Sequence, residues 1–315
     1  MSMPRPAEAS RYTVGRFAQR LAAVAFALLL VPATGFAQGR MINAKSETRS
    51  AAQGLAAAVS AEAALGGAEW VGYAAPMEGG RRQMCCYDSF SDGTACCSRC
   101  RLESGSGAST NTGSSGAGGG RIMLEPPTEF FVLARLEAGK VVRVRTFTPD
   151  CEVDAGGMTV VWLTDVKPDQ SVAWLSSVVA AASHESERTD RVTSSALAAL
   201  AVHAGPESVR ALVRFAREDE STRLRGQALF WLAQKAGEQA IATITGAIDN
   251  DPETDVKKKA VFALSQLPKD EGVPLLIQVA KTNRNPEVRK QAMFWLGQTH
   301  DPRAVTFFEE ILSRK

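Results

Sequence analysis

A 32-residue repeat dominates the chain from Arg191 to Lys315. Each unit carries apolar residues at the spacing i, i+4, i+8, which places them on one face of a helix. A second helical set follows in each unit with the same step, beginning at Val209, Ile241, Val273 and Val305. Four helix pairs are therefore predicted over residues 191–315. A fixed period of this length is typical of an α-solenoid, whose units are stable only when stacked. The first-helix columns are Val192, Leu224, Val256, Val288; Ala196, Ala228, Ala260, Ala292; and Leu200, Leu232, Leu264, Leu296.

The start of the chain has the pattern of an export signal over residues 1–37. Arg11, Arg16 and Arg20 precede the apolar run 21–31, and small residues follow before Gln38. The run is much shorter than the roughly 20 residues that span a bilayer, so we expect cleavage rather than a permanent anchor. The mature protein is therefore predicted to be periplasmic or secreted.

Residues 38–66 are polar and then rich in alanine. We predict a flexible leader that contains one weak helix.

Six cysteines lie between this leader and the repeats. In an exported chain an even number indicates disulfide bonds, although six cysteines allow about 15 connectivities. Neighbouring cysteines are not expected to pair with each other, because the resulting ring would strain the peptide between them. A zinc site or a redox pair formed by Cys97 and Cys100, which have two residues between them, remains an alternative. The predicted disulfide cysteines are Cys85, Cys86, Cys96, Cys97, Cys100 and Cys151.

Residues 67–166 have the pattern of a small, mostly antiparallel β unit stapled by these disulfides. Strands are predicted at residues 70–73 and 159–163, and a hairpin at 130–144 turns at Gly139. Arg143 and Arg145 alternate with valines, which predicts one wet and one buried face. The Gly/Ser-rich stretch 103–120 is predicted to be a flexible loop. The fold class is accordingly α + β.

Residues 167–190 form a predicted half-repeat. Pro168 opens a helix, and Trp174, Leu175 and Val178 line one side of it. We expect this helix to cover the first edge of the array and to join it to the β unit.

The repeats resemble HEAT repeats, in particular the short type found in phycobilisome lyases and many bacterial scaffolds. The resemblance is carried by residues 224–233, 256–265 and 288–297 and by an acidic or amide residue six positions before a basic one. It implies that these pairs form a structural ladder between neighbouring repeats. The pairs are Asp219 with Arg225, Asp251 with Lys257, and Asn283 with Arg289.

Two sets of residues are candidates for partner binding. Trp231 and Trp295 recur in one column in which Ala199 and Ala263 alternate with them. They form either an aromatic stripe for a ligand or an interdigitated packing in which each ring fills the space left by an alanine. Arg210, Arg214 and Arg217 share one side of a second helix, which is either a solvated face or a binding patch.

No catalytic residues or cofactors are predicted. The sequence lacks a G-x-S-x-G elbow, an H-E-x-x-H motif, a P-loop and a dinucleotide fingerprint. A net charge of +2 gives no reason to expect a nucleic-acid partner. The leading hypothesis is an exported, non-enzymatic scaffold that binds a protein partner in the periplasm or envelope. The alternatives are chromophore-lyase-like chemistry, implied by the resemblance, and a thiol redox or metal sensor that uses Cys97 and Cys100.

Overall fold

The computed structural model describes residues 40–78, 100–103, 127–149, 151–182, 187–219, 221–235 and 237–313. The predicted signal peptide, nearly all of the loop 103–120, and Cys85, Cys86, Cys96 and Cys97 lie outside these residues. Ala37–Lys315 forms one compact unit.

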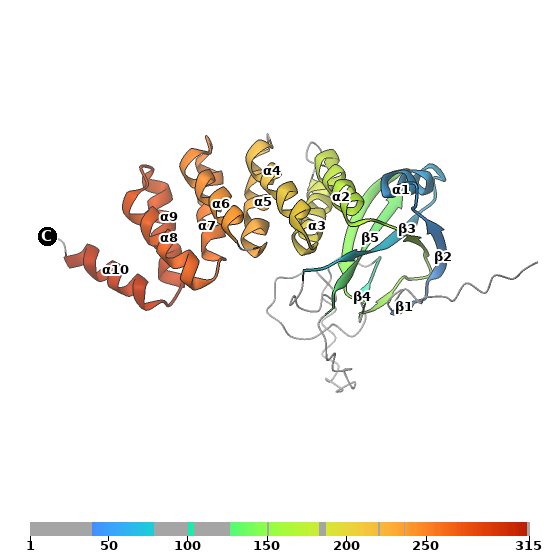
Figure 1. Ribbon diagram of the computed structural model, residues 1–315, viewed down its shortest axis with the longest axis horizontal. Helices are drawn as coiled ribbons and strands as arrows, with labels where there is room; N and C mark the ends of the chain where they lie inside the picture. The colour runs from blue at the N-terminus through green and yellow to red at the C-terminus, as the bar shows by residue number, and fades with distance from the viewer. Residues whose placement is uncertain are drawn as a thin grey trace, which may run out of the picture. The chain divides into compact units, whose positions relative to one another are not determined.

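A five-stranded mixed sheet occupies the N-terminal half, in the order β2-β8-β3-β5-β6. Figure 1 labels three of its strands, β2, β3 and β5. The predicted strands and hairpin are confirmed as β3, β8, β5 and β6. The prediction of a mostly antiparallel sheet is wrong, because β8 pairs in parallel with both β2 and β3. The strands are β2 (Lys45–Ser50), β3 (Glu69–Pro76), β5 (Glu129–Glu137), β6 (Lys140–Phe147) and β8 (Thr159–Thr164).

A second, three-stranded sheet is entirely parallel, in the order β1-β7-β4. Its strands are β1 (Arg40–Ile42), β4 (Cys100–Arg101) and β7 (Glu152–Asp154).

The flexible leader expected over residues 38–66 is replaced by ordered structure in its described part. β1 and β2 each join a sheet, and the weak helix forms α1 (Leu55–Ala64), which buries Leu55 and Val59. Local sequence could not show these strands, because their partners β7 and β8 lie more than 100 residues away. All six side chains of β2 are exposed, so this strand lacks the alternation by which strands are recognised.

Both faces of the five-stranded sheet are covered. Phe130, Val132 and Ala134 of β5 join a core shared with the helices, whereas Phe131 and Leu133 join a second core that also contains residues beside the small sheet. The predicted wet face of the hairpin is therefore wrong. Arg143 and Arg145 are half-buried, and Arg143 Nη1 donates to the carbonyl of Leu102 at 3.0 Å.

Cys151 is the cysteine whose side chain the structure describes. It is 2% exposed, lies 3.4 Å from the hydroxyl of Thr148, and is disulfide-bonded. Its partner is not among the described side chains, so the stapling of the β unit by specific bridges stays a prediction.

The remainder of the described chain is helical and forms successive helix pairs (Figure 1). The predicted helix of the half-repeat is α2 (Pro168–Ala182), which packs on α3 and on β3. The repeats follow in the predicted order as α3 (Glu187–Val202), α4 (Pro206–Glu218), α5 (Thr222–Lys235), α6 (Glu238–Asn250), α7 (Thr254–Ser265), α8 (Lys269–Thr282), α9 (Pro286–Gln298) and α10 (Pro302–Ser313).

The first helices of neighbouring repeats, α5, α7 and α9, pack directly on one another, whereas the second helices pack more loosely. All three predicted first-helix columns are buried. In the second helices, Leu212, Ile244 and Leu276 are buried, but Val305 of α10 is 56% exposed. Val305 belongs to the other second-helix column, with Val209, Ile241 and Val273, and it is exposed because no further described helix covers α10.

The ladder implied by the HEAT resemblance is formed around Arg225. Its guanidinium makes a bidentate ion pair with Asp251, at 2.8 and 3.0 Å, and donates to the carbonyl of Asp219 at 2.9 Å. The buried ion pair raises the pKa of Arg225. Arg289 donates to the backbone carbonyls of Asn283, at 2.8 Å, and Arg284, at 3.1 Å. Lys257 donates to the carbonyl of Asp249. The ion pair between neighbouring repeats is therefore found at Arg225, because the next repeat supplies Asp251 as its partner.

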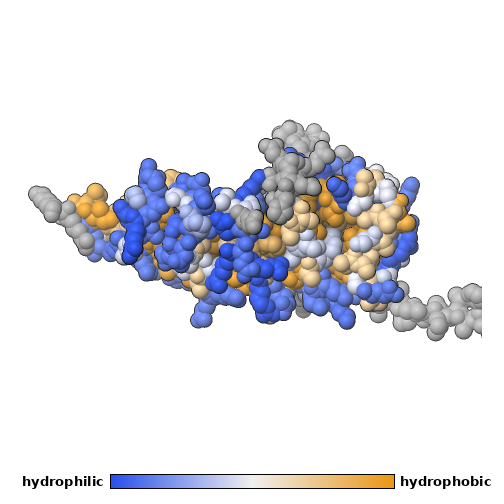
Figure 2. All heavy atoms as spheres, turned by 90° about the horizontal axis from the view of Figure 1, so that it is seen from above, coloured by the Kyte–Doolittle hydropathy of each residue, from blue (hydrophilic) through white to orange (hydrophobic). Residues whose placement is uncertain are grey.

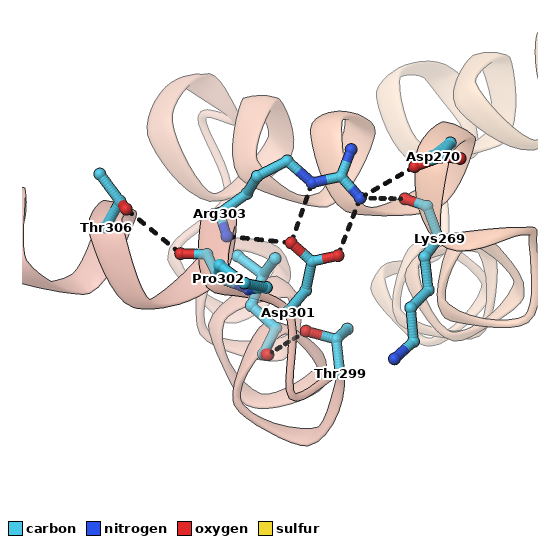
Figure 3. Close-up of polar contacts among 8 residues, drawn as sticks. Lys269, Asp270, Thr299, Asp301, Pro302, Arg303 and Thr306 are labelled. Carbon is cyan, nitrogen blue, oxygen red and sulfur yellow. Dashed lines mark hydrogen bonds and ion pairs between the residues drawn. The ribbon is translucent and has the colours of Figure 1, made fainter.

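A polar cluster at the start of α10 ties the last helix to α8 (Figure 3). The carboxylate of Asp301 accepts from the backbone N–H and the guanidinium of Arg303 at 2.8–2.9 Å. Arg303 also donates to the carbonyl of Lys269 at 3.1 Å. The hydrogen bonds that Arg303 donates to the carboxylate, from its side chain above all, lower the pKa of Asp301 to about 2.

The end of β3 is joined to the repeats by backbone and side-chain contacts. Ala204 N donates to the carbonyl of Pro76 at 2.9 Å, and Glu78 N donates to the carbonyl of Val202 at 3.2 Å. The buried ammonium of Lys235 lies 3.0 Å from the carboxylate of Glu78 and also donates to the carbonyl of His203.

The His203 ring is fully buried at this junction, edge-on to Phe130. Its Nδ1 lies 2.9 Å from the carbonyl of Ala204, so Nδ1 carries the proton. No hydrogen-bond partner for Nε2 is found among the described residues. Burial lowers the pKa of His203, and the nearby Lys235 charge lowers it further, against the opposing effect of the Ala204 carbonyl. The folded protein therefore holds this imidazole neutral.

We predict that His203 makes the folded state sensitive to mild acid. Because its folded-state pKa lies below the unfolded value of about 6.5, its stabilising effect is complete above that pH. The effect is lost progressively as the pH falls from about 6.5 toward the folded-state pKa. Urea midpoints measured at pH 7.5 and 5.5 should differ more for the wild-type chain than for His203→Gln. An equal difference in the two proteins would contradict the prediction.

Candidate partner-binding surfaces of the helical repeats

The three arginines expected to form a patch all lie exposed on α4. Arg210 is paired with Glu207 one turn earlier. The guanidinium of Arg214 lies 5.2 Å from the ring centroid of Phe215, and Arg217 Nη2 donates to Thr243 Oγ1 at 3.3 Å. Neither Arg214 nor Arg217 has an ion-pair partner among the described residues. The uncompensated positive charge of this surface therefore comes from these two side chains.

Arg217 borders an open crevice between α4 and α6, with a volume of about 420 Å³. Arg225 and Asp251 also line it, and they neutralise each other through their bidentate ion pair. We call this the α4–α6 crevice. It is lined by Ala216, Arg217, Arg225, Thr243, Gly246, Ala247, Asn250, Asp251 and Pro252.

The tryptophan column lies within a continuous series of aromatic contacts across α5, α7 and α9. Phe230 contacts Trp231 edge-on at 5.2 Å and stacks on Phe262 at 5.8 Å, with the two ring planes 6° apart. Phe262 contacts Trp295 at 4.8 Å, and Trp295 contacts Phe294 at 5.0 Å. Trp231 is only 7% exposed, so it lies inside the packing between helices.

Trp295, by contrast, is half-buried and lines a second crevice of about 370 Å³. This α7–α9 crevice lies between the ends of α7 and α9 and the start of α8, and both apolar and polar residues line it. Its lining residues are Leu264, Ser265, Gln266, Leu267, Lys269, Gly272, Val273, Leu276, Trp295, Gln298, Thr299 and His300. The two tryptophans occupy the same column in the sequence but have different environments in the structure.

The structure adds residues to the arginine surface that sequence reasoning did not single out. Thr243, Gly246 and Asn250 on α6 face the crevice beside Arg217. A signal for them existed in the repeat register, because Gly246 occupies a position at which the next repeat has Gln278.

Apolar surface is also exposed at the C-terminal end of the repeats (Figure 2). It contains Val305, Ile311 and Leu312 of α10, and Phe294 of α9 is 54% exposed.

The described residues contain no group of three or more histidine, cysteine, aspartate or glutamate side chains placed to hold a metal ion. None of their helices combines the length and the apolar character that crossing a bilayer requires. Cys97 and the side chain of Cys100, on which the sensor hypothesis depends, lie outside the described part.

The fold and these surfaces define a protein of stacked helical repeats. A family model described as HEAT repeats matches residues 209–292 and 241–315, which confirms the resemblance seen in the sequence. Residues 209–315 are therefore HEAT repeats.

The solved structures that are similar to this chain include a chain in the complex of CpcE and CpcF of phycocyanin lyase from Nostoc sp. PCC7120. The match has 18% sequence identity and a TM-score of 0.35, and it covers 46% of this chain and 91% of that chain. A likeness at this level carries no argument about function. No curated protein matches the chain.

We predict that Trp231 contributes to stability rather than to an exposed binding stripe. Trp231→Ala should lower the free energy of unfolding by about 3–5 kcal/mol, the usual cost of truncating a buried aromatic side chain. The matched change Phe294→Ala removes a ring that is already half in solvent, and it should cost less than about 1.5 kcal/mol. Urea denaturation measures both values, and similar losses in the two variants would contradict the assignment.

Proposed function

We propose that this chain is an exported, non-enzymatic scaffold whose HEAT-repeat surface binds a protein partner in the periplasm or cell envelope. The observation that carries the proposal is the α4 surface, where Arg214 and Arg217 are exposed and Arg217 borders an open crevice. Arginine is enriched at protein interfaces, and stacked repeats expose long surfaces suited to extended partners.

Export is supported by the basic residues and the apolar run before Gln38. The first described strand, β1, begins at Arg40, so cleavage at the proposed site leaves both sheets intact. The disulfide at Cys151 suits an oxidising compartment. We further propose that bridges among the six cysteines fasten the segment between β3 and β5 to the small sheet.

The β unit adds to the scaffold through the core that it shares with α2 and α3. Its backbone bonds to Val202 and Ala204 and its ion pair with Lys235 hold the end of β3 against the first two repeats. This arrangement gives the repeats a covered first end.

Export is tested by recovering the chain from the cells that express it. We expect the protein in the periplasmic or secreted fraction, with Gln38 as its N-terminal residue and with no free thiol detected by titration. Recovery of the uncleaved chain in the cytosol would contradict the proposal. Two reactive thiols would instead favour the sensor hypothesis.

Partner binding is tested by crosslinking and pull-down from envelope extract with the mature chain, residues 38–315. The double variant Arg214→Glu/Arg217→Glu should reduce recovery of the specific partner at least about tenfold. The control is Arg284→Glu/Lys290→Glu, which changes the net charge equally at exposed positions on another repeat. If both variants recover the partner as the wild-type chain does, the α4 surface is not the binding site.

A further inference from the structure

The α4–α6 crevice is open because small residues occupy positions at which the next repeat has larger ones. An added Cβ at Gly246 would meet no atom within 4 Å, so the space in front of this residue is empty. The equivalent interface between α6 and α8 is built from bulkier side chains at the same register. In steps of 32 residues, Ala216 corresponds to Ile248, Thr243 to Leu275, Gly246 to Gln278, and Ala247 to Val279. The small residues at these four positions therefore leave space at the α4–α6 interface that longer side chains would occupy.

The walls of the crevice are fixed before any ligand binds. Thr243 Oγ1 donates to the carbonyl of Gln239 at 2.8 Å, and Asn250 Nδ2 donates to the carbonyl of Gly246 at 3.1 Å. Ala216, Ala247 and Pro252 supply apolar surface. A side chain that enters the crevice would lose its own freedom but would order few groups of the protein, which favours affinity.

The charge of the crevice is set by Arg217. Arg225 and Asp251 also line it, but they are bound to each other through two hydrogen bonds. Arg217 makes one long hydrogen bond, to Thr243, so most of the five N–H donors of its guanidinium are available. Arg214 lies one turn earlier on the same side of α4 and adds a second positive charge.

We propose that the α4–α6 crevice binds the carboxylate of a glutamate or aspartate side chain in a segment of the protein partner. Arg217 holds the carboxylate in the bidentate geometry that guanidinium groups favour. The aliphatic part of the acidic side chain lies against Ala216 and Ala247. A phosphate dianion fits less well, because Asp251 lines the same crevice and Arg217 is its single unneutralised cation. This inference rests on the proposed function and specifies the chemistry of the partner.

The test uses the mature chain, residues 38–315, and fluorescein-labelled acetylated hexapeptides. One peptide carries a single glutamate among alanine and leucine residues, and its match carries glutamine instead. Fluorescence anisotropy should give a Kd at least about tenfold lower for the glutamate peptide, because a charge-assisted bidentate contact is lost with glutamine. The preference should shrink as the salt concentration rises. Arg217→Gln should abolish it.

Two further variants separate binding in the crevice from attraction to the general surface charge. Gly246→Gln copies the residue at the equivalent position in the next repeat and fills the crevice without changing the charge. It should weaken binding of the glutamate peptide at least about tenfold while thermal unfolding and circular dichroism show a folded protein. Arg210→Gln removes an equal charge from the same helix, but this guanidinium is paired with Glu207, so binding should be unchanged.

Several outcomes would overturn the proposal. Equal binding of the two peptides would do so, as would wild-type affinity in both Arg217→Gln and Gly246→Gln. A concentration-dependent dimer of the unliganded chain that disappears in Arg217→Gln would assign the crevice to a second copy instead of a partner. The proposed function is tested by a different outcome. If the wild-type chain and Arg217→Gln recover the partner equally, the scaffold function stands but this site is not the binding site. If the peptide binds but no partner can be recovered, the site stands and the scaffold function is contradicted.

Discussion

The packing of α5, α7 and α9 on one another is the constraint on which the rest of the structure depends. Their columns at Ala228, Ala260 and Ala292 are fully buried and carry only a methyl group, so neighbouring helices approach closely. A single helix pair could not bury these columns, and each repeat is therefore stable only against its neighbours. Because the first helices determine the spacing, the second helices are left less closely packed, and the α4–α6 crevice lies between two of them.

The two ends of this stack of helices differ in how much of their apolar surface is covered. At its start, α2 and the first helix of the first repeat, α3, pack against the five-stranded sheet, and one hydrophobic core runs through the sheet and the helices. The buried Lys235 and His203 add a polar junction at the same place, with each backbone carbonyl satisfied. At the other end, α10 is fastened to α8 through Arg303, but Val305, Ile311 and Leu312 remain exposed. The β unit therefore serves as the cover that the repeats need at their first end.

The candidate surfaces show which features of a binding site can be predicted from residue patterns in the sequence. Three arginines on one side of a helix were visible in the sequence, but only the structure shows that Arg210 is paired and that Arg217 borders a crevice. Trp231 and Trp295 share a column, yet one is enclosed between helices and the other lines a crevice near the end of the stack. The position of a residue in its repeat identifies the helix face on which it lies. Its accessibility depends on which neighbours cover that face.

The sequence by itself determined the helix pairs, their order and the β5–β6 hairpin, because the periodicity and turn chemistry that specify them are local. The tertiary structure alone decided the parallel pairing of β1 with β7 and of β2 with β8, since strand pairing joins residues more than 100 positions apart. It also decided that β5 is buried on both faces, which depends on the helices and the small sheet that cover it. The open space at Gly246 also depends on the tertiary structure, because a missing side chain forms a crevice only where two helices face each other.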